Sequence, residues 1–234
     1  MVSFSLKYYF GRRKFSWLMK SKMIVPRSFA THSGSFHADE VTACALLIIF
    51  GQIDLEKVVR TRETKELERC EYVCDVGGIY DSTLKRFDHH QSDYLGNYSS
   101  AGMVLKYLKD EKVVTEKLYR YLNQTLVMGV DAIDNGKATP MLGHSSFSSV
   151  IANFVPVRHD VDHQVFQEAF FQALTFCIGH LERLIGKFHY IQDCRSLIKA
   201  EMDKNKDFEG ILTGIKGQYL IFDNEYVLNV RKYT

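Results

Sequence analysis

The sequence lacks a long apolar segment and has no cysteine arrangement typical of a metal knuckle. Its longest apolar run, ACALLIIF at residues 43–50, is far shorter than the roughly 20 apolar residues that a membrane-spanning helix needs. The five cysteines are odd in number, and no two of them are spaced as Cys-x-x-Cys. We therefore expect reduced, mostly buried thiols in a reducing compartment, and no membrane partner.

Acidic residues are missing from the first 38 positions, which contain seven Lys or Arg residues. A basic, acid-poor start is typical of a mitochondrial presequence, whereas the absence of a long apolar stretch disfavours a secretory signal. The simpler interpretation is a disordered basic leader over residues 1–23, with Met19 or Met23 as an alternative start. We expect a cytoplasmic protein, with a mitochondrial location as the alternative.

The chain also has little net charge, +2 over 234 residues, and neither a repeat nor a low-complexity tract. Its charge as a whole therefore does not indicate nucleic-acid binding, although a local basic groove is compatible with it. Apolar residues make up 46% and charged residues 25%, as in ordinary globular proteins, and the length suits one large domain or two small ones.

Short β-branched segments alternate with helical patterns in the first part of the chain. Strands are predicted within residues 23–32, 56–62, 71–78 and 82–88, and helices are predicted to start near residues 38, 99 and 116. This alternation predicts an α/β domain over residues 24–140, with a mostly parallel sheet and flanking helices. Residues 141–234 read instead as an irregular Ser-rich segment, a long amphipathic helical region and a short β tail.

Histidine and aspartate gather where these elements end. The set comprises His32, His37, Asp39, Asp75, Asp88, His89, His90, Asp131 and Asp134. Imidazole and carboxylate together suit Mn, Fe, Co or Zn, and one ion takes about four to six ligands. The set therefore predicts two ions, with Asp75 as the bridging carboxylate.

Each of these residues also has a simpler interpretation. A lone histidine is usually a packed or surface residue, Asp39 could merely favour a helix N-terminus, and Asp134 could belong to a turn. The grouping of several clusters at element ends favours the metal site.

Six segments, taken in chain order, resemble the melanocyte-proliferating-gene (MYG1-type) family of the DHH phosphoesterase superfamily. They are THSGSFHADEVTACALL, VVRTR, DVGGIYD, RFDHHQ, SSAG and VDAIDNG. The resemblance is strong over residues 28–136 and weak to about residue 200. It implies a DHH-like metal-binding domain, a binuclear centre with two Mn²⁺ ions (Mg²⁺, Co²⁺ or Zn²⁺ as alternatives), and 3′→5′ exonuclease activity on RNA.

The resemblance also implies a role for each matching residue. His32, His37, Asp39, Asp75, His89 and Asp134 would be metal ligands, with Asp131 as a less well matched candidate. His37 stands where most of the superfamily has an aspartate, one residue further along. The catalytic pair would be His90, facing the phosphate, and Asp88, orienting a neighbour.

Phosphate binding needs basic side chains near the metals. We expect Arg60 and Arg62, at the end of VVRTR, and then Lys137 and His144 to provide them. Since alternate strand residues point to opposite faces, at least one of the two arginines is expected to be a surface charge.

The function that these residues predict is hydrolysis of RNA or short oligonucleotides by a two-metal mechanism. One alternative keeps the site but acts on pyrophosphate or a cyclic dinucleotide. Another is a non-catalytic metal-binding scaffold. The Gly-rich GGGH-like stretch of superfamily substrate domains is missing, so we expect a truncated second domain within residues 141–234.

Overall fold

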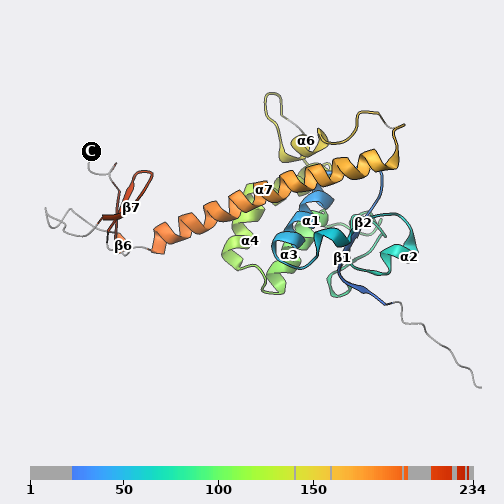
Figure 1. Cartoon of the computed structure of the whole chain (residues 1–234), viewed down its shortest axis with the longest axis horizontal. Helices are drawn as coiled ribbons and strands as arrows, with labels where there is room; N and C mark the ends of the chain where they lie inside the picture. The colour runs from blue at the N-terminus through green and yellow to red at the C-terminus, as the bar shows by residue number, and fades with distance from the viewer. Residues whose placement is uncertain are drawn as a thin grey trace, which may run out of the picture.

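The computed structural model describes residues 23–139, 141–158, 160–196, 198–199, 212–222, 226–229 and 231. Residues 1–22 of the predicted leader lie outside the described residues. The centre of the fold is a five-stranded sheet in the order β2-β1-β3-β5-β4. Figure 1 labels β1 and β2 of this sheet. Its strands are β1 (Val25–Thr31), β2 (Val58–Arg60), β3 (Cys70–Cys74), β4 (Tyr80–Asp81) and β5 (Arg86–Phe87). All neighbouring pairs are parallel except β4 and β5, so the predicted mostly parallel α/β sheet is confirmed.

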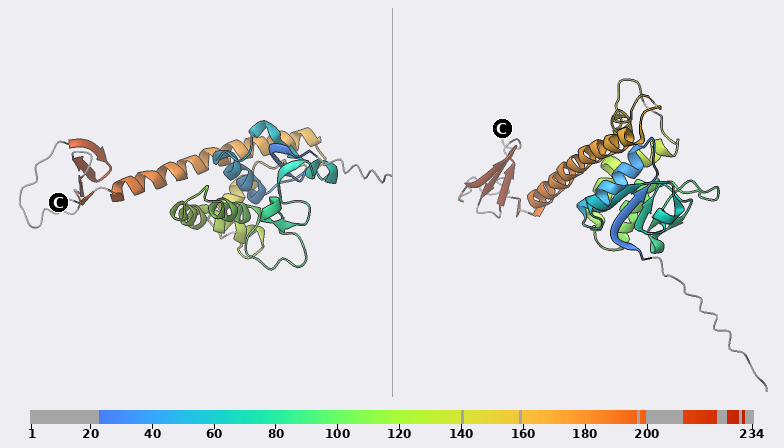
Figure 2. Two further views of the ribbon diagram at one scale, coloured as in Figure 1. Left: turned by 90° about the horizontal axis from the view of Figure 1, so that it is seen from below. Right: turned by 45° about the vertical axis from the view of Figure 1, so that its right-hand side comes forward.

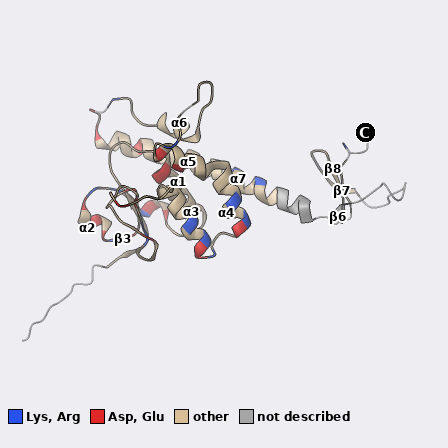
Figure 3. Ribbon diagram, turned by 180° about the vertical axis from the view of Figure 1, so that it is seen from behind, with Lys and Arg blue, Asp and Glu red and all other residues tan. Residues whose placement is uncertain are grey.

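Helix α1 (Ala38–Ile49) is the central helix of the core. It packs against both α3 (Ser100–Asp110) and α7 (His163–Ser196), and Figure 2 shows α7 running alongside it in two views. Because α1 is enclosed in this way, even its polar residues Asp39, Glu40 and Thr42 have no exposed surface. A helix that is apolar nearly all round is expected in such a position. Charged residues instead occupy the outer surfaces of α3 and α4 (Glu116–Leu122), where both signs occur (Figure 3).

The short connections complete the domain. A 3₁₀ turn η1 (Leu55–Lys57) precedes β2, α2 (Thr64–Leu67) precedes β3, and a second 3₁₀ turn η2 (Ser82–Leu84) lies between β4 and β5. The sequence indicated a strand across residues 82–88, but only its last part is β structure. Asp81 explains the difference, because its carboxylate accepts hydrogen bonds from Thr83 N and Leu84 N and so caps a turn.

The helical pattern of residues 116–136 is interrupted by a π-helical turn. Helix α4 leads into η3 (Asn123–Val127), and α5 (Met128–Asp134) follows it. A π turn accommodates an extra residue, so it shifts the face that the following helix presents. The turn therefore helps to decide which way Asp131 and Asp134 point, and the apolar periodicity alone did not predict it.

After α5 the chain forms α6 (Phe147–Ala152), which the Ser-rich sequence did not predict, and then α7. Beyond α7 lies a second sheet of β6 (Ile198–Lys199), β7 (Leu212–Lys216), β8 (Tyr219–Phe222) and β9 (Tyr226–Asn229), in the order β6-β9-β8-β7. Figure 1 places this sheet at the far end of α7 from the α/β domain. The helical region and β tail are confirmed, while the division at residue 140 stays a prediction. Within the described residues, no helix combines the length and hydropathy of a membrane span.

Arg60, at the end of β2, fastens α7 to the domain. Its guanidinium lies 5.3 Å from the ring centroid of Phe36 and 4.6 Å from that of Phe170. It also donates hydrogen bonds to Gly34 O (2.6 Å) and Phe166 O (3.1 Å). Burial lowers the pKa of Arg60 to about 10. The first turns of α7 and the loop before α1 are thereby tied to the same strand end.

The cysteines for which side chains are described are buried, as the sequence predicts. Cys44 and Cys177 face the contact between α1 and α7, where Cys177 Sγ lies 3.9 Å from Thr42 Oγ1. Cys70 and Cys74 are buried at the ends of β3. Burial raises the pKa of all four thiols. The side chain of Cys194 lies outside the described residues.

Helices α3 and α5 approach closely at Gly102. Asp131 on α5 accepts hydrogen bonds at Oδ1 from Ser99 N (3.0 Å), Ser99 Oγ (2.7 Å) and Gly102 N (3.0 Å), and so caps α3. A Cβ atom placed on Gly102 would lie 2.1 Å from Asp131 Oδ2, inside van der Waals contact. Glycine is therefore required by the packing at this position.

We predict that Gly102→Ala destabilises the protein by about 1–3 kcal/mol, because α3 and α5 must move apart. The matched control is Gly129→Ala, also within a helix, where an added Cβ meets nothing within 4 Å. That control is expected to be neutral or stabilising by up to about 1 kcal/mol. Urea unfolding of both variants measures the difference, and equal stability of the two would contradict the close approach.

Candidate metal centre

The candidate centre lies at the carboxyl ends of β1 and β3. In the strand order β2-β1-β3, the chain runs from β1 outwards to β2 and then returns to the other side of β1. Open α/β sheets bind ligands at such a reversal. His32 directly follows β1 and Asp75 directly follows β3, and His32 Nε2 lies 3.0 Å from Asp75 Oδ2.

Asp75 is held in an unusual backbone conformation. Its φ is 56°, in the left-handed region, and Gly77 and Gly78 in the same loop also have positive φ. Aspartate tolerates this region better than most residues that have a Cβ atom. The tight loop keeps the carboxylate buried at the strand end instead of letting it turn towards solvent.

The two oxygens of Asp75 face different partners. Oδ2 faces His32, while Oδ1 lies 3.4 Å from His89 Nε2 and 3.2 Å from His90 Nδ1. Burial would raise the pKa of Asp75, but hydrogen bonds from His32 and His89 outweigh burial and lower it to about 2. A carboxylate shared between two groups of ligands in this way has the arrangement of a bridge.

Asp39, in the first turn of α1, is a buried carboxylate with no exposed surface. Among the residues that the structure describes, none forms a hydrogen bond with either of its oxygens. Burial, together with the neighbouring carboxylates of Glu40, Asp75 and Asp134, raises its pKa well above the usual value. An unpaired carboxyl group in this position is costly unless a cation or another partner compensates it.

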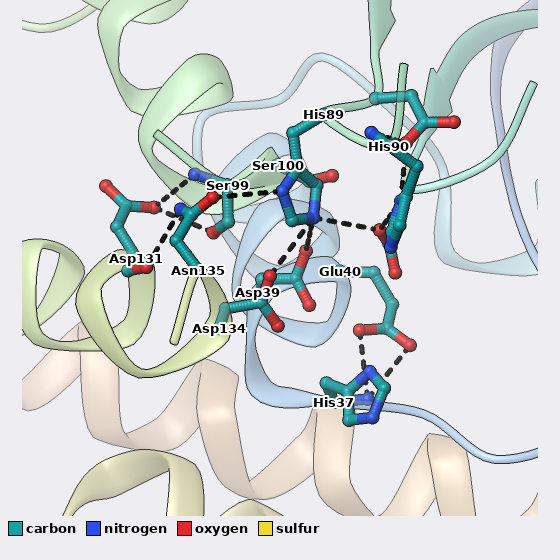
Figure 4. Close-up of polar contacts among 12 residues, drawn as sticks. His37, Asp39, Glu40, His89, His90, Ser99, Ser100, Asp131, Asp134 and Asn135 are labelled. Atoms are coloured by element: carbon teal, nitrogen blue, oxygen red, sulfur yellow. Dashed lines mark hydrogen bonds and ion pairs between the residues drawn. The ribbon is translucent and has the colours of Figure 1, made fainter. Parts of the chain in front are cut away.

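Glu40 follows Asp39 and is equally buried. Its carboxylate accepts the backbone N–H of His37 at 3.0 Å (Figure 4). It also lies 3.2 Å from His32 Nε2. Burial lowers the pKa of His32, but the contacts with Asp75 and Glu40 more than offset it and raise that pKa to about 10. The sequence did not indicate Glu40 as a candidate ligand, because an acidic residue in the first turn of a helix ordinarily stabilises that helix.

His89 connects the DHH segment to α5. Its Nε2 atom lies 3.0 Å from Asp134 Oδ2, 3.4 Å from Asp75 Oδ1 and 3.9 Å from Asp39 Oδ2. Burial opposes protonation, yet the contacts with Asp134 and Asp75 raise the pKa of His89 to about 10. Metal binding at this nitrogen therefore has to displace a proton.

Asn135 orients the imidazole of His89, a role that the sequence did not indicate. His89 Nδ1 lies 3.3 Å from Asn135 Oδ1 (Figure 4). The Asn135 amide nitrogen donates to Asp131 O at 2.9 Å and to Asn97 O at 3.3 Å, which identifies the other atom as the oxygen. Since that oxygen only accepts, Nδ1 carries a proton, and the proton that a metal ion would displace is the one on Nε2, which faces the carboxylates. In the sequence, Asn135-Gly136 indicated only a helix end.

His90 points the other way from the same segment. Its side chain is 63% exposed, and Nδ1 lies 2.8 Å from Asp88 Oδ1. Asp88 is buried and also accepts His90 N at 3.1 Å and Gly78 N at 2.6 Å. Asp88 thus links His90 to the loop that carries Asp75, and His90 Nε2 is left without a role in holding that loop.

The donor atoms form three groups whose members lie within 4.8 Å of one another. These groups are His32, His37, Glu40 and Asp75; Asp75, His89 and His90; and His37, Asp39 and Asp134. Asp75 belongs to two of them, and the mixed nitrogen and oxygen donors suit a divalent transition metal. The residues therefore fit metal ions, and the orphaned oxygens of Asp39 are the feature that a cation would satisfy.

The remaining predicted site residues lie elsewhere. Asp131 caps α3 through its three hydrogen bonds, and burial raises its pKa to about 6. Arg60 is enclosed by Phe36 and Phe170, with N–H groups donated to carbonyl oxygens. Arg62 and His144 are exposed, and no hydrogen bond or ion pair among the described residues joins either to the cluster. Their phosphate-binding roles stay predictions.

Lys137 lies just beyond α5 and holds the loop before α3. Its Nζ donates to Gly96 O at 3.0 Å and to Asn97 Oδ1. Asn97 O in turn accepts from Asn135. Lys137 thus contacts Asn97, which is hydrogen-bonded to the Asn135 that orients His89. The phosphate-binding role of Lys137 stays a prediction.

Comparison with known proteins places these features in a wider context. The family model MYG1_exonuc, described as an uncharacterised protein family (UPF0160), matches residues 28–228. A MYG1 protein of Chlamydia trachomatis is 51% identical over 182 residues, 78% of this chain and 62% of that protein. The MYG1 exonuclease of Homo sapiens is 29% identical over 197 residues, 67% of this chain and 52% of that protein. The MYG1 exonuclease of Bos taurus is 33% identical over 141 residues, 50% of this chain and 37% of that protein.

No solved structure matches the chain. The chain also spans only about three fifths of the length of the first curated relatives it matches, 62% in each case. The match to the family model runs through the α/β domain and α7 and continues into the strands beyond α7, as far as residue 228.

We predict that Asn135→Ala weakens Mn²⁺ binding by about 10–100-fold, because His89 loses the partner that orients its ring. Asn135→Asp keeps an acceptor for Nδ1–H and is expected to retain most of the affinity. Calorimetric titration with MnCl₂ measures both variants, with the exposed Asn153→Ala as the control. Unchanged affinity in Asn135→Ala would contradict the orienting role.

Proposed function

Because the chain belongs to the MYG1 family, we propose that it is a metal-dependent phosphodiesterase that removes nucleotides from the 3′ end of RNA or short oligonucleotides. The observation that carries the proposal is the position of Asp75, whose two carboxylate oxygens face two groups of metal-type ligands. Hydrolysis of phosphate esters is a common use of paired metal sites that share a ligand.

The names of relatives support a nuclease. The human and bovine family members are named exonucleases, and the family model carries the same word in its name. Since this chain spans only part of the relatives' length, activity and substrate remain proposals for it. The order of the His- and Asp-bearing segments supports a further assignment, to the DHH phosphoesterase superfamily.

Two groups of residues would hold the ions. His32, His37 and Glu40 would serve one position together with Asp75. Asp39 and Asp134, both near His89 Nε2, would serve the other with His89, and Asp75 would serve this position also. The chemistry that manganese would supply here, when bound, is the acidification of a water molecule and positive charge beside the phosphoryl oxygens. Manganese accepts the mixed nitrogen and oxygen donors that this chain offers.

The chain's own residues would position the substrate. Asp88 accepts the Nδ1 proton of His90, so the imidazole is fixed with Nε2 directed away from Asp88. Because the His90 side chain is 63% exposed, that nitrogen is accessible to a phosphate oxygen. We assign His90 to phosphate binding and charge stabilisation at the scissile group, and Asp88 to its orientation.

The experiment that tests the proposal compares wild-type protein with Asp75→Asn on a 5′-labelled short RNA in the presence of Mn²⁺. Asparagine tolerates the left-handed backbone at this position, so the variant removes charge with little change in the loop. We expect a ladder that shortens from the 3′ end in the wild type. In the variant, the rate should fall by more than the 10–100-fold loss typical of residues that only support ligands.

The exposed loop variant Asp93→Asn serves as the control and is expected to retain activity. Metal content, measured by mass spectrometry of dialysed protein, should be about two ions per chain in the wild type and lower in Asp75→Asn. Metal-loaded wild type that fails to cleave RNA would contradict the exonuclease proposal. Equal activity of Asp75→Asn would remove Asp75 from the site.

His90→Ala tests the phosphate-facing role separately. Because His90 is expected to act on substrate more than on metal, kcat should fall by about 10²–10³-fold while metal content stays near the wild-type value. Single-turnover cleavage of the same RNA measures the rate. Loss of metal from His90→Ala would instead show that this histidine is a ligand.

A further inference from the structure

A pocket of about 690 Å³ lies against α5, which is the helix that also carries Asp134. Its walls come from β4, the loop before α3, and helices α3 and α5, including Tyr80, Tyr98 and Lys106. Asp131 also lines it, one helical turn before Asp134. Residues three apart on a helix are neighbours on its surface, so this wall adjoins the candidate metal centre.

Three half-buried tyrosines shape the pocket. The rings of Tyr80 and Tyr94 meet edge to face, with centroids 5.8 Å apart and an interplanar angle of 88°. The Tyr94 hydroxyl donates to Tyr98 O at 3.0 Å and accepts from Tyr98 N at 3.2 Å, which fixes the loop that carries both. The walls therefore offer aromatic surface on a constrained loop.

Two lysines add positive charge. Lys106, on α3, lines the pocket and pairs with Asp110 at its side. Lys137 donates to Gly96 O and Asn97 Oδ1 across the pocket wall, which leaves the third of its three N–H groups available. Aromatic rings beside basic side chains are the combination that binds a base together with its phosphate.

The same residues contact both the pocket and the candidate metal centre. Asn135 contacts His89 through its oxygen and Asn97 O through its nitrogen. Asn97 and Lys137 both line the pocket. One short segment therefore positions a metal-facing imidazole on one side and a pocket wall on the other.

We propose that this pocket holds a nucleobase of the oligonucleotide substrate, stacked on the tyrosine surface, while the adjoining phosphate lies at the metal centre. The proposal rests on the proposed nuclease function and names a subsite for it. Stacking does not depend on base identity, because every base has an aromatic face, so this subsite predicts little sequence preference.

The test measures binding without hydrolysis. A fluorescently labelled short oligoadenylate and an abasic sugar–phosphate chain of the same length are titrated with the full chain in EDTA, and anisotropy is recorded. The wild type is expected to bind the base-containing chain at least about fivefold more tightly, the lower end for one stacked base. Equal affinity for the two probes would overturn the proposal.

Variants place the effect in the pocket. Tyr80→Leu removes a ring and should abolish the preference for bases while leaving abasic binding unchanged, and Tyr80→Phe should keep it. Tyr121→Leu, which removes a half-buried ring outside the pocket, should also keep it. A preference that survives in Tyr80→Leu would contradict the assignment.

A surface variant covers the case in which Tyr80→Leu does not fold. Met128 lines the pocket and its exposed fraction is 56%, so Met128→Glu should fold normally. Its negative charge should weaken oligoadenylate binding by at least fivefold, and unchanged binding would count against the pocket. Base-dependent binding without Mn²⁺-dependent cleavage would uphold the subsite and reject the exonuclease, whereas cleavage without base-dependent binding would do the reverse.

Discussion

Asp39 is a carboxylate with no exposed surface and no hydrogen bond from any described residue to either oxygen, placed beside the carboxylates of Asp75, Asp134 and Glu40. Concentrating negative charge in a poorly solvated region is unfavourable unless positive charge is brought to it. In this protein the nearby positive charge comes from His32 and His89, whose pKa values are both raised to about 10 by those carboxylates. Divalent ions would stabilise the same arrangement. The structure around the cluster is therefore suited to cation binding.

That support comes from every part of the α/β domain. Helix α1 is buried between α3 and α7, which brings its first turn to the ends of β1 and β3. Asp88 links the loop of Asp75 to His90, and Asp131 fastens α5 to α3 at Gly102. Because the carboxylates repel one another, these contacts outside the cluster help His32 and His89 to hold them in place.

Membership of the MYG1 family agrees with this picture, because the family model covers the whole set of candidate ligands. The curated relatives are longer than this chain, which spans about three fifths of the first of them. The candidate metal centre is contributed by residues 32–135, entirely within the matched part. The pocket beside α5 lies in the same part.

Local pattern determined much of this architecture. Strand and helix alternation predicted the mostly parallel sheet, and the placement of His32, Asp75 and His89 at element ends predicted that they would meet, because parallel strands bring their carboxyl ends to one edge. Three things depended on packing between segments distant in sequence. Asp131 caps α3, because the N-terminus of that helix packs against its carboxylate. Arg60 connects β2 to α7. It is enclosed by aromatic rings that no local pattern brings together. Asn135 and Glu40 joined the centre through their contacts with His89 and His32, which residue spacing does not encode because the packing of separate elements brings these side chains together.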